Sequence, residues 1–206
     1  MSLPYARTYD EAYLYISLRP CVCGETEFED RVWQSLAAGG QTGERISGHC
    51  ANCGRFREFT FDMPEEPREL PFEVQYGPDG EPSRLIDPGE WLGIAELYVL
   101  TAQDRLDAGD LTEDEDITRV YYLLTSALAA VEETMKFIPT GADSVPEGAF
   151  WSQAGRLVFE SAPERFSRAR LDQQRERLRQ GVVEFEDKYG TEDADVSDDG
   201  PGQASA

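Results

Sequence analysis

The sequence has little histidine and lacks any long apolar run. His49 is the only histidine among 206 residues, so general acid–base chemistry would have to depend on carboxylates. No Gly-rich phosphate loop, Ser-His-Asp set or Cys-His pair with an orienting acid occurs, and we therefore predict that the protein is not an enzyme. No window approaches the roughly 20 apolar residues of a membrane span, and no basic leader precedes an apolar run. We expect a cytoplasmic protein without membrane contact.

Positive charge is also scarce. The chain carries 41 acidic side chains against 19 basic ones, which gives a formal net charge of −22 at pH 7. A field of this sign repels nucleic-acid phosphates and anionic membranes, and it favours a cationic partner. Lysine is limited to Lys136 and Lys188, and this arginine bias is typical of a GC-rich bacterial genome. We expect a basic protein partner rather than nucleic acid, while the oligomeric state stays open.

Residues 1–63 are predicted to form a short helix and a β module. The segment Thr8-Tyr-Asp-Glu11 is a capping box, which predicts a helix that runs to about Leu18. Aromatic and β-branched residues then predict three strands, with a Gly-rich turn at 37–43 between the first two. The expected strands are 27–36, 44–48 and 55–61.

Residues 64–86 are crowded with proline and glycine, which disfavour both helices and central strands, so we predict a linker there. Residues 87–189 are predicted to form a helical domain of about four helices. Residues 190–206 are acidic and almost free of large apolar side chains, which predicts a disordered tail. The expected fold class is α+β, with a small β module joined to a mostly helical domain.

The starts of the first two helices in this domain carry recognisable signals. Asp87 is a capping aspartate followed by proline, and it predicts a helix to about Ala108. Apolar residues surround this helix nearly completely, which is typical of a helix enclosed by others. A second capping box, Thr112 to Glu115, predicts the start of the next helix, which Pro139 should stop. Two further helices are expected at 147–159 and 163–189.

Four cysteines form two close pairs, Cys21-Val-Cys23 and Cys50-Ala-Asn-Cys53, and a glycine follows each pair directly. Structural Zn²⁺ sites use four soft thiolates at the corners of a tetrahedron. Glycine after each pair suits a tight turn with positive φ that directs backbone N–H groups toward the sulfurs. We therefore predict that all four cysteines bind one structural zinc ion. Four thiolates fill the coordination shell and leave no open position for catalysis.

These pairs, joined by a predicted hairpin and followed by a third strand, resemble the zinc-ribbon family over about residues 20–61. The first pair departs from the usual Cys-x-x-Cys spacing by one residue, which affects the expected geometry of that turn. Three alternatives stay open: an iron–sulfur cluster, a redox pair formed by Cys50 and Cys53, and unliganded thiols. His49 adjoins Cys50 and could replace a cysteine, but we interpret it as a strand residue beside the metal site.

The segment Arg165 to Arg179 is the only basic stretch in the chain. Acids alternate with its arginines at helical spacing, which favours a salt-bridged or solvated helix face over a phosphate-binding one. Its role stays open.

These features together favour an acidic adaptor or inhibitor that binds a basic protein. The chain bears a general likeness to acidic bacterial toxin-immunity proteins, which implies an inhibitor that neutralises a toxin. The alternative, implied by the zinc-ribbon resemblance, is a nucleic-acid-associated regulator of transcription or translation. A hydrolase or transferase would require a pocket in which several carboxylates with perturbed pKa values converge.

Overall fold

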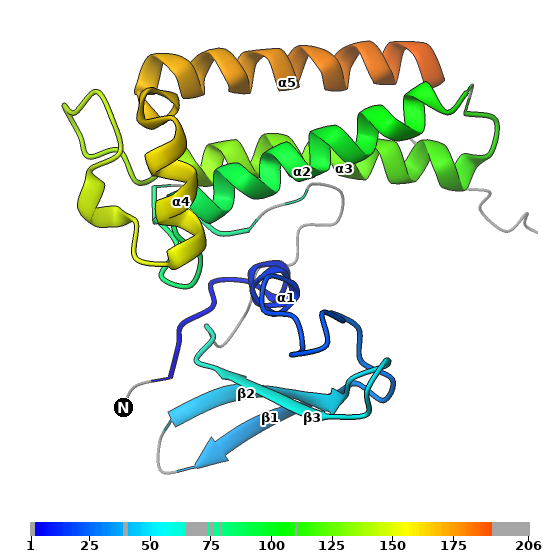
Figure 1. Cartoon of the computed structure of the whole chain (residues 1–206), viewed down its shortest axis with the longest axis vertical. Coiled ribbons are helices and arrows are strands. Elements are labelled where there is room, and N and C mark those ends of the chain that lie inside the picture. The colour runs from blue at the N-terminus through cyan, green and yellow to red at the C-terminus, as the bar shows by residue number, and fades with distance from the viewer. Residues whose placement is uncertain are drawn as a thin grey trace, which may run out of the picture.

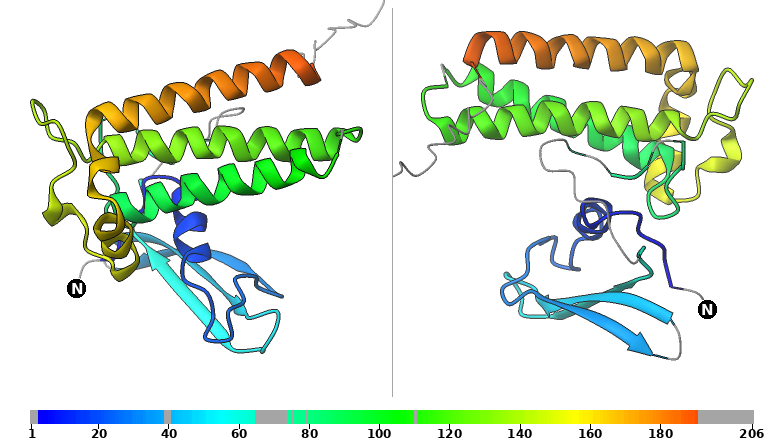
Figure 2. Two further views of the ribbon diagram at one scale, coloured as in Figure 1. Left: turned by 45° about the horizontal axis from the view of Figure 1, so that its top comes forward. Right: turned by 180° about the vertical axis from the view of Figure 1, so that it is seen from behind.

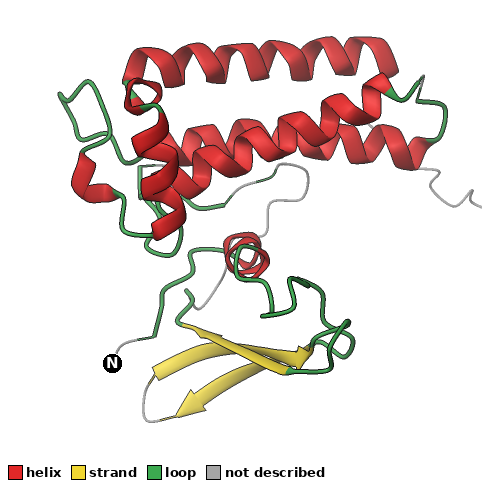
Figure 3. Cartoon of the chain, in the orientation of Figure 1, coloured by secondary structure: helices red, strands yellow, loops and turns green. Residues whose placement is uncertain are grey.

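The computed structural model describes residues 3–38, 41–64, 74, 76–78, 80–109 and 111–190, without the side chains of residues 37, 38, 41 and 42. The fold is α+β, as predicted, with a three-stranded sheet and a helical part (Figures 1 and 3). The predicted tail falls outside the described residues from 191 onward. In chain order the elements are α1 (Tyr9–Ser17), β1 (Val32–Ala38), β2 (Gln41–His49), β3 (Phe56–Phe61), α2 (Pro88–Asp107), α3 (Asp114–Met135), the 3-10 turn η1 (Glu147–Ala149), α4 (Gln153–Ser161), the 3-10 turn η2 (Pro163–Phe166) and α5 (Arg168–Tyr189).

The sheet is antiparallel with the order β1-β2-β3, and α1 lies across one of its faces (Figure 1). The predicted turn at 37–43 is too long, because both strands extend further and Ala38 pairs with Gln41. The first strand begins at Val32, not at 27, since Phe28 makes only an isolated bridge with Cys50. Residues 39 and 40, between the two strands, lie outside the described residues.

The long helices α2, α3 and α5 run side by side, and the short helix α4 crosses α2 near its start (Figure 2). The expectation that α2 is enclosed on all sides is wrong. Trp91 and Leu92 are fully buried, whereas Leu97 and Leu100 are 60% and 63% exposed. Its apolar face is therefore wider than the surface that its neighbours cover.

Local signals predicted two helix starts well and one badly. Both bonds of the Asp87 capping box are present at α2. At α1, Thr8 accepts the N–H of Glu11 as predicted, but the Glu11 carboxylate accepts from Arg7 instead of Thr8. The predicted capping box at Thr112 does not form: the N-cap of α3 is Glu113, one residue later, and it makes no side-chain cap hydrogen bond.

Each of the last two predicted helices is interrupted by a specific contact. Ser152 caps α4 through its hydroxyl, and its own N–H donates to Asp87, so η1 and α4 are separate elements. Ser167 separates η2 from α5, and the next N–H, that of Arg168, donates to the carbonyl of Asp143. These partners are distant in sequence, so helix periodicity alone does not reveal the breaks.

A single apolar cluster includes residues from the β module and from the helical part. Ile46 and Phe61 of the sheet belong to it, as do Trp91 of α2 and Val131 of α3, all of them fully buried. Tyr76, within the predicted linker, is also part of this cluster. The predicted domain boundaries stay a prediction, but the described residues on both sides of them share one core.

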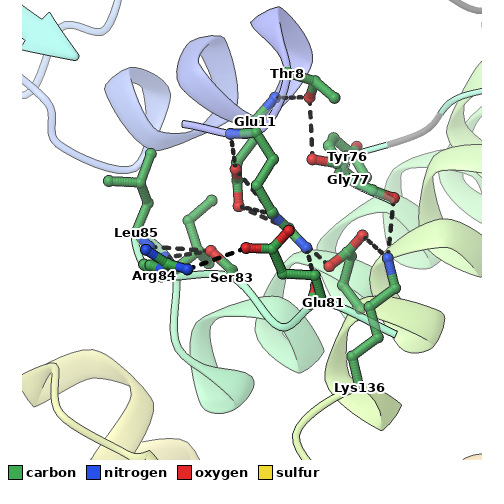
Figure 4. Close-up of polar contacts among 12 residues, drawn as sticks. Thr8, Glu11, Tyr76, Gly77, Glu81, Ser83, Arg84, Leu85 and Lys136 are labelled. Carbon is green, nitrogen blue, oxygen red and sulfur yellow. Dashed lines mark hydrogen bonds and ion pairs between the residues drawn. The ribbon is translucent and has the colours of Figure 1, made fainter. Parts of the chain in front are cut away.

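A buried ion network joins α1 to α3 (Figure 4). The Arg7 guanidinium lies 2.7 Å from the Glu11 carboxylate and 2.8 Å from that of Glu133, and all three side chains are at most 3% exposed. Lys136 donates to Glu133 at 2.7 Å and to the carbonyls of Gly77 and Pro78 at 3.0 Å. Two cations and two carboxylates therefore balance, and every one of them has a partner.

The charged state of this network follows from its contacts. Burial raises the pKa of Glu133 above its ordinary value, although Arg7 and Lys136 oppose the shift. Burial also lowers the pKa of Arg7, but hydrogen bonds and attraction from Glu11 and Glu133 outweigh this effect and raise it. Because Glu133 contacts two cations at under 3 Å, we assign it as a carboxylate.

Two glycines permit the close crossing of α2 and α4. A Cβ at Gly89 would overlap the backbone of Gly155, and a Cβ at Gly155 would overlap the Asp87 carboxylate. Asp87 is fully buried there and accepts N–H groups from Gly89, Glu90 and, at 2.7 Å, Ser152. One carboxylate thus caps α2 and anchors the start of α4.

Replacing Gly155 with alanine is expected to lower the free energy of unfolding by about 3 kcal/mol, from overpacking and from loss of the Asp87 cap. Gly181→Ala in α5 is the matched control, since nothing lies within 4 Å of its Cβ. Alanine there should stabilise the helix by up to about 1 kcal/mol. Denaturant unfolding of both variants measures the difference, and equal effects would contradict the crossing geometry.

Candidate metal centre

The structure brings all four predicted cysteines together at one end of the sheet. Their sulfur atoms lie within 4.8 Å of one another, and they form a group that could hold a metal ion. The closest pairs, Cys21 with Cys53 and Cys23 with Cys50, each join the two turns at 3.5 Å. Four thiolates arranged tetrahedrally at about 2.3 Å from zinc would be about 3.8 Å apart. The observed spacing brackets that value.

The two cysteine turns close in the same way despite their different lengths. In the second turn, the Cys50 N–H donates to the Arg55 carbonyl, and the Gly54 N–H donates to Cys50, both at 2.9 Å. In the first turn, Cys21 N–H donates to the carbonyl of Glu25, and the N–H of Gly24 donates to Cys21, both at 2.8 Å. The missing residue therefore shortens the loop between the cysteines and leaves both closing bonds intact.

Glycine is required at the end of each turn, as predicted. Gly24 has a φ of 91° and Gly54 a φ of 68°, conformations that residues with a Cβ rarely adopt. The turns place Cys21 and Cys50 in the interior, while Cys23 and Cys53 remain exposed. Two of the four cysteines therefore lie in the protein interior, and the other two lie at the surface.

Backbone N–H groups stabilise negative charge on the second cysteine pair. The N–H groups of Cys53 and Asn52 point at the Cys50 sulfur and lower the pKa of this thiol to about 6, against the effect of burial. The Arg55 N–H alone would lower the pKa of Cys53, but contacts with the other three thiols raise it to about 12. Thiols this close resist joint ionisation, whereas a bound dication removes that opposition.

Arg57 holds the first cysteine turn against the sheet. Arg57 as a whole is 8% exposed, and its guanidinium donates to the carbonyls of Thr26 and Arg19 and stacks 4.5 Å over the ring of Phe28. Sequence reasoning missed this role. The signal was the alternation in β3, which places Arg57 on the same sheet face as the buried Phe61.

His49 does not belong to the sulfur group. It ends β2, and its Nδ1 lies 2.9 Å from the carboxylate of Asp30, which also accepts the His49 backbone N–H at 2.7 Å. Among the described residues, the group that could hold a metal ion consists of the four cysteines and does not include His49. The interpretation of His49 as a strand residue beside the site is confirmed.

Comparisons with protein-family models, with curated proteins and with solved structures found no match. The likeness to toxin-immunity proteins therefore rests on acidity alone. The likeness to a zinc ribbon rests on the cysteine geometry and on the sheet that carries it.

The geometry also bears on the alternatives for the four cysteines. All four thiols are free, and their closest sulfur pairs are far longer than a disulfide bond of about 2.05 Å. A redox pair would require only Cys50 and Cys53, whereas the fold gathers Cys21 and Cys23 around the same point. A multi-iron cluster binds its thiolates to separate metal atoms and requires wider spacing than one ion. The donor set fits a single tetrahedral ion.

Three of the six arginines between Arg165 and Arg179 pair with neighbouring acids. Arg165 pairs with Glu96 of α2, and Arg179 pairs with Glu132 of α3. Arg175 lies 2.9 Å from Asp172 on the same helix. These contacts support the predicted salt-bridged helix face.

A cavity of about 350 Å³ between α3, α5 and the segment before α2 contains two acids, Glu132 and Glu133. The first pairs with Arg179, and the second belongs to the buried network with Arg7 and Lys136. Both carboxylates are therefore engaged in structural contacts. In the part of the chain that the structure describes, no helix has the length and apolarity needed to span a membrane.

Proposed function

We propose that the four cysteines hold one structural Zn²⁺ ion and that this ion organises the β module. The supporting observation is the set of four sulfur atoms, gathered from two separate turns to within 4.8 Å. Cys21, Cys23, Cys50 and Cys53 would supply the whole coordination shell. Zinc rather than mononuclear iron is expected because Zn²⁺ has no redox chemistry and is the usual ion of structural four-thiolate sites.

We further propose a non-enzymatic role, in which the protein binds a basic protein partner and, in its most concrete form, neutralises a toxin. The net charge of −22 supports this proposal because it accelerates encounter with a cationic surface. Toxins that cleave nucleic acids have cationic clefts, which an acidic inhibitor can occupy in place of phosphate. The pairing of the basic stretch with acids, including Arg165 with Glu96, leaves it poorly suited to phosphate binding.

Affinity capture from the native source at low and moderate salt tests this function. We expect one stoichiometric protein rich in lysine and arginine, identified by mass spectrometry, whose association rate falls steeply as ionic strength rises. Purified partner and protein should then form a complex of defined stoichiometry, and the isolated partner should regain any toxic activity that the complex suppresses.

Recovery of nucleic acid that persists at moderate salt without a protein bridge would contradict the inhibitor and favour the regulator. A nuclease treatment of the captured material separates these outcomes. The zinc content of the same preparation is measured as well, so that the metal proposal is tested separately from the partner proposal.

A further inference from the structure

The sheet of the β module has one covered face and one uncovered face. Helix α1 packs on the first face, where Trp33 lies against Tyr9 and Tyr13 with ring centroids 4.8 and 5.3 Å away. No described element lies against the opposite face in any of the views (Figures 1 and 2). Alternation along the strands places on it Val32, Gln34, Arg45, Ser47, His49, Phe56 and Glu58.

Two large apolar side chains are exposed on this uncovered face. Val32 of β1 and Phe56 of β3 are each 55% exposed. The register places them diagonally across β2, because Val32 pairs with Ser47 and Phe56 pairs with His49. The His49 ring lies 5.5 Å from that of Phe56 and extends this surface. Apolar side chains grouped on an open sheet face are typical of a docking site.

The charges around this pair have one prevailing sign. Asp30 and Glu58 are 59% and 45% exposed. Among the described residues on this face, Arg45 is the one permanent cation, and it lies 3.6 Å from Glu58 and also bonds to Gln34. A four-thiolate zinc centre at the same end of the sheet would add two further negative charges.

We propose that this uncovered sheet face is the docking surface for the basic partner, which inserts an apolar side chain between Val32 and Phe56 and places lysine or arginine beside Asp30 and Glu58. The inference rests on the proposed function and specifies where it acts. A second copy of the chain is disfavoured, because each copy carries a net charge of −22 and would bring its own Asp30 and Glu58 to the interface. Single-stranded nucleic acid could stack on Phe56 but would find no free cation among the described residues of this face for its phosphates.

Selection of a random-peptide display library on the immobilised zinc-loaded protein tests the surface with a defined probe. We expect enrichment of peptides that combine lysine or arginine with an aromatic or aliphatic residue. Against a selected synthetic peptide, the double variant Val32→Ala/Phe56→Ala should bind about tenfold more weakly or worse. Glu58→Gln should weaken binding mainly at low salt.

Leu157→Ala on α4 is the matched control, because Leu157 is also an exposed apolar side chain, at 60%, but lies outside the sheet. It should leave peptide binding unchanged, and all variants should keep their zinc content and circular dichroism. The proposal is overturned if peptides bind the double variant as tightly as the parent protein. It is also overturned if a labelled single-stranded oligonucleotide binds this face, or if sedimentation shows a dimer that the double variant dissociates.

Failure of this inference can be told apart from failure of the proposed function. A native basic partner that binds the double variant with unchanged affinity would place the docking surface elsewhere and leave the function in place. Lack of any basic partner in native capture, together with no basic peptide in the selection, would remove both.

Discussion

Replacing Cys50 with serine is expected to remove the metal and unfold the β module. Cys50 is fully buried, and its sulfur lies 3.5 Å from that of Cys23. Serine offers no soft thiolate, and the remaining sulfurs would no longer enclose the ion. Zinc-finger peptides gain about 10 to 16 kcal/mol from binding structural zinc, so the loss should exceed the stability of this small module. Metal analysis and circular dichroism before and after chelation measure the effect.

His49→Ala provides the control for this experiment, because His49 adjoins Cys50 in sequence but bonds to Asp30. It should retain one zinc ion per chain and nearly parental stability. Full metal content in Cys50→Ser, or a sheet that survives chelation unchanged, would show that these cysteines do not form a structural metal site.

Replacing Arg7 with methionine is expected to destabilise the fold by about 3 to 5 kcal/mol. Methionine fills a similar volume but leaves the carboxylates of Glu11 and Glu133 buried without their shared cation. Arg84→Met is the matched control, since Arg84 is 68% exposed and its contacts are a surface ion pair with Glu81 and the Tyr5 ring at 5.1 Å. It should change stability by less than about 1 kcal/mol. Urea unfolding at neutral pH compares the two variants.

The pH dependence of the Arg7→Met variant provides a second readout. Without Arg7, the folded-state pKa of Glu133, which burial already raises, should rise further above the unfolded value of about 4.3. A carboxyl group whose pKa is raised in the folded state does not destabilise the fold at a pH below its unfolded-state pKa. As the pH rises above that pKa, the group lowers the free energy of unfolding increasingly. The difference in the free energy of unfolding between the variant and the parent protein should therefore become smaller as the pH falls. A deficit that does not depend on pH would indicate lost packing rather than buried charge.

Local sequence signals predicted much of the secondary structure and the grouping of the four cysteines. Asp87 caps α2 because its side chain needs only the next three residues to satisfy free N–H groups. Gly24 and Gly54 mark the two cysteine turns for a similar reason, since positive φ is a property of one residue. The four cysteines were recognisable because a tetrahedral thiolate site requires two short turns of this kind.

Signals of the same kind failed where a distant group competed. The predicted helices around Ser152 and Ser167 were broken by bonds to Asp87 and Asp143. The boundary of the first strand was also wrong: β1 begins at Val32, and before it the Asp30 carboxylate accepts the His49 N–H across the sheet. Sequence periodicity contains no information about such partners.

By itself, the sequence determined the α+β class, the acidic field, the four cysteines and the caps at Thr8 and Asp87, because each depends on composition or on a few adjacent residues. Only the tertiary structure decided that Arg7 meets Glu133, 126 positions away, and that Gly89 and Gly155 allow two helices to cross. It also decided that Arg57 is buried while Val32 and Phe56 are exposed. The reason is physical: the burial of a charge or an apolar group depends on what packs against it, and that is established only when the chain has folded.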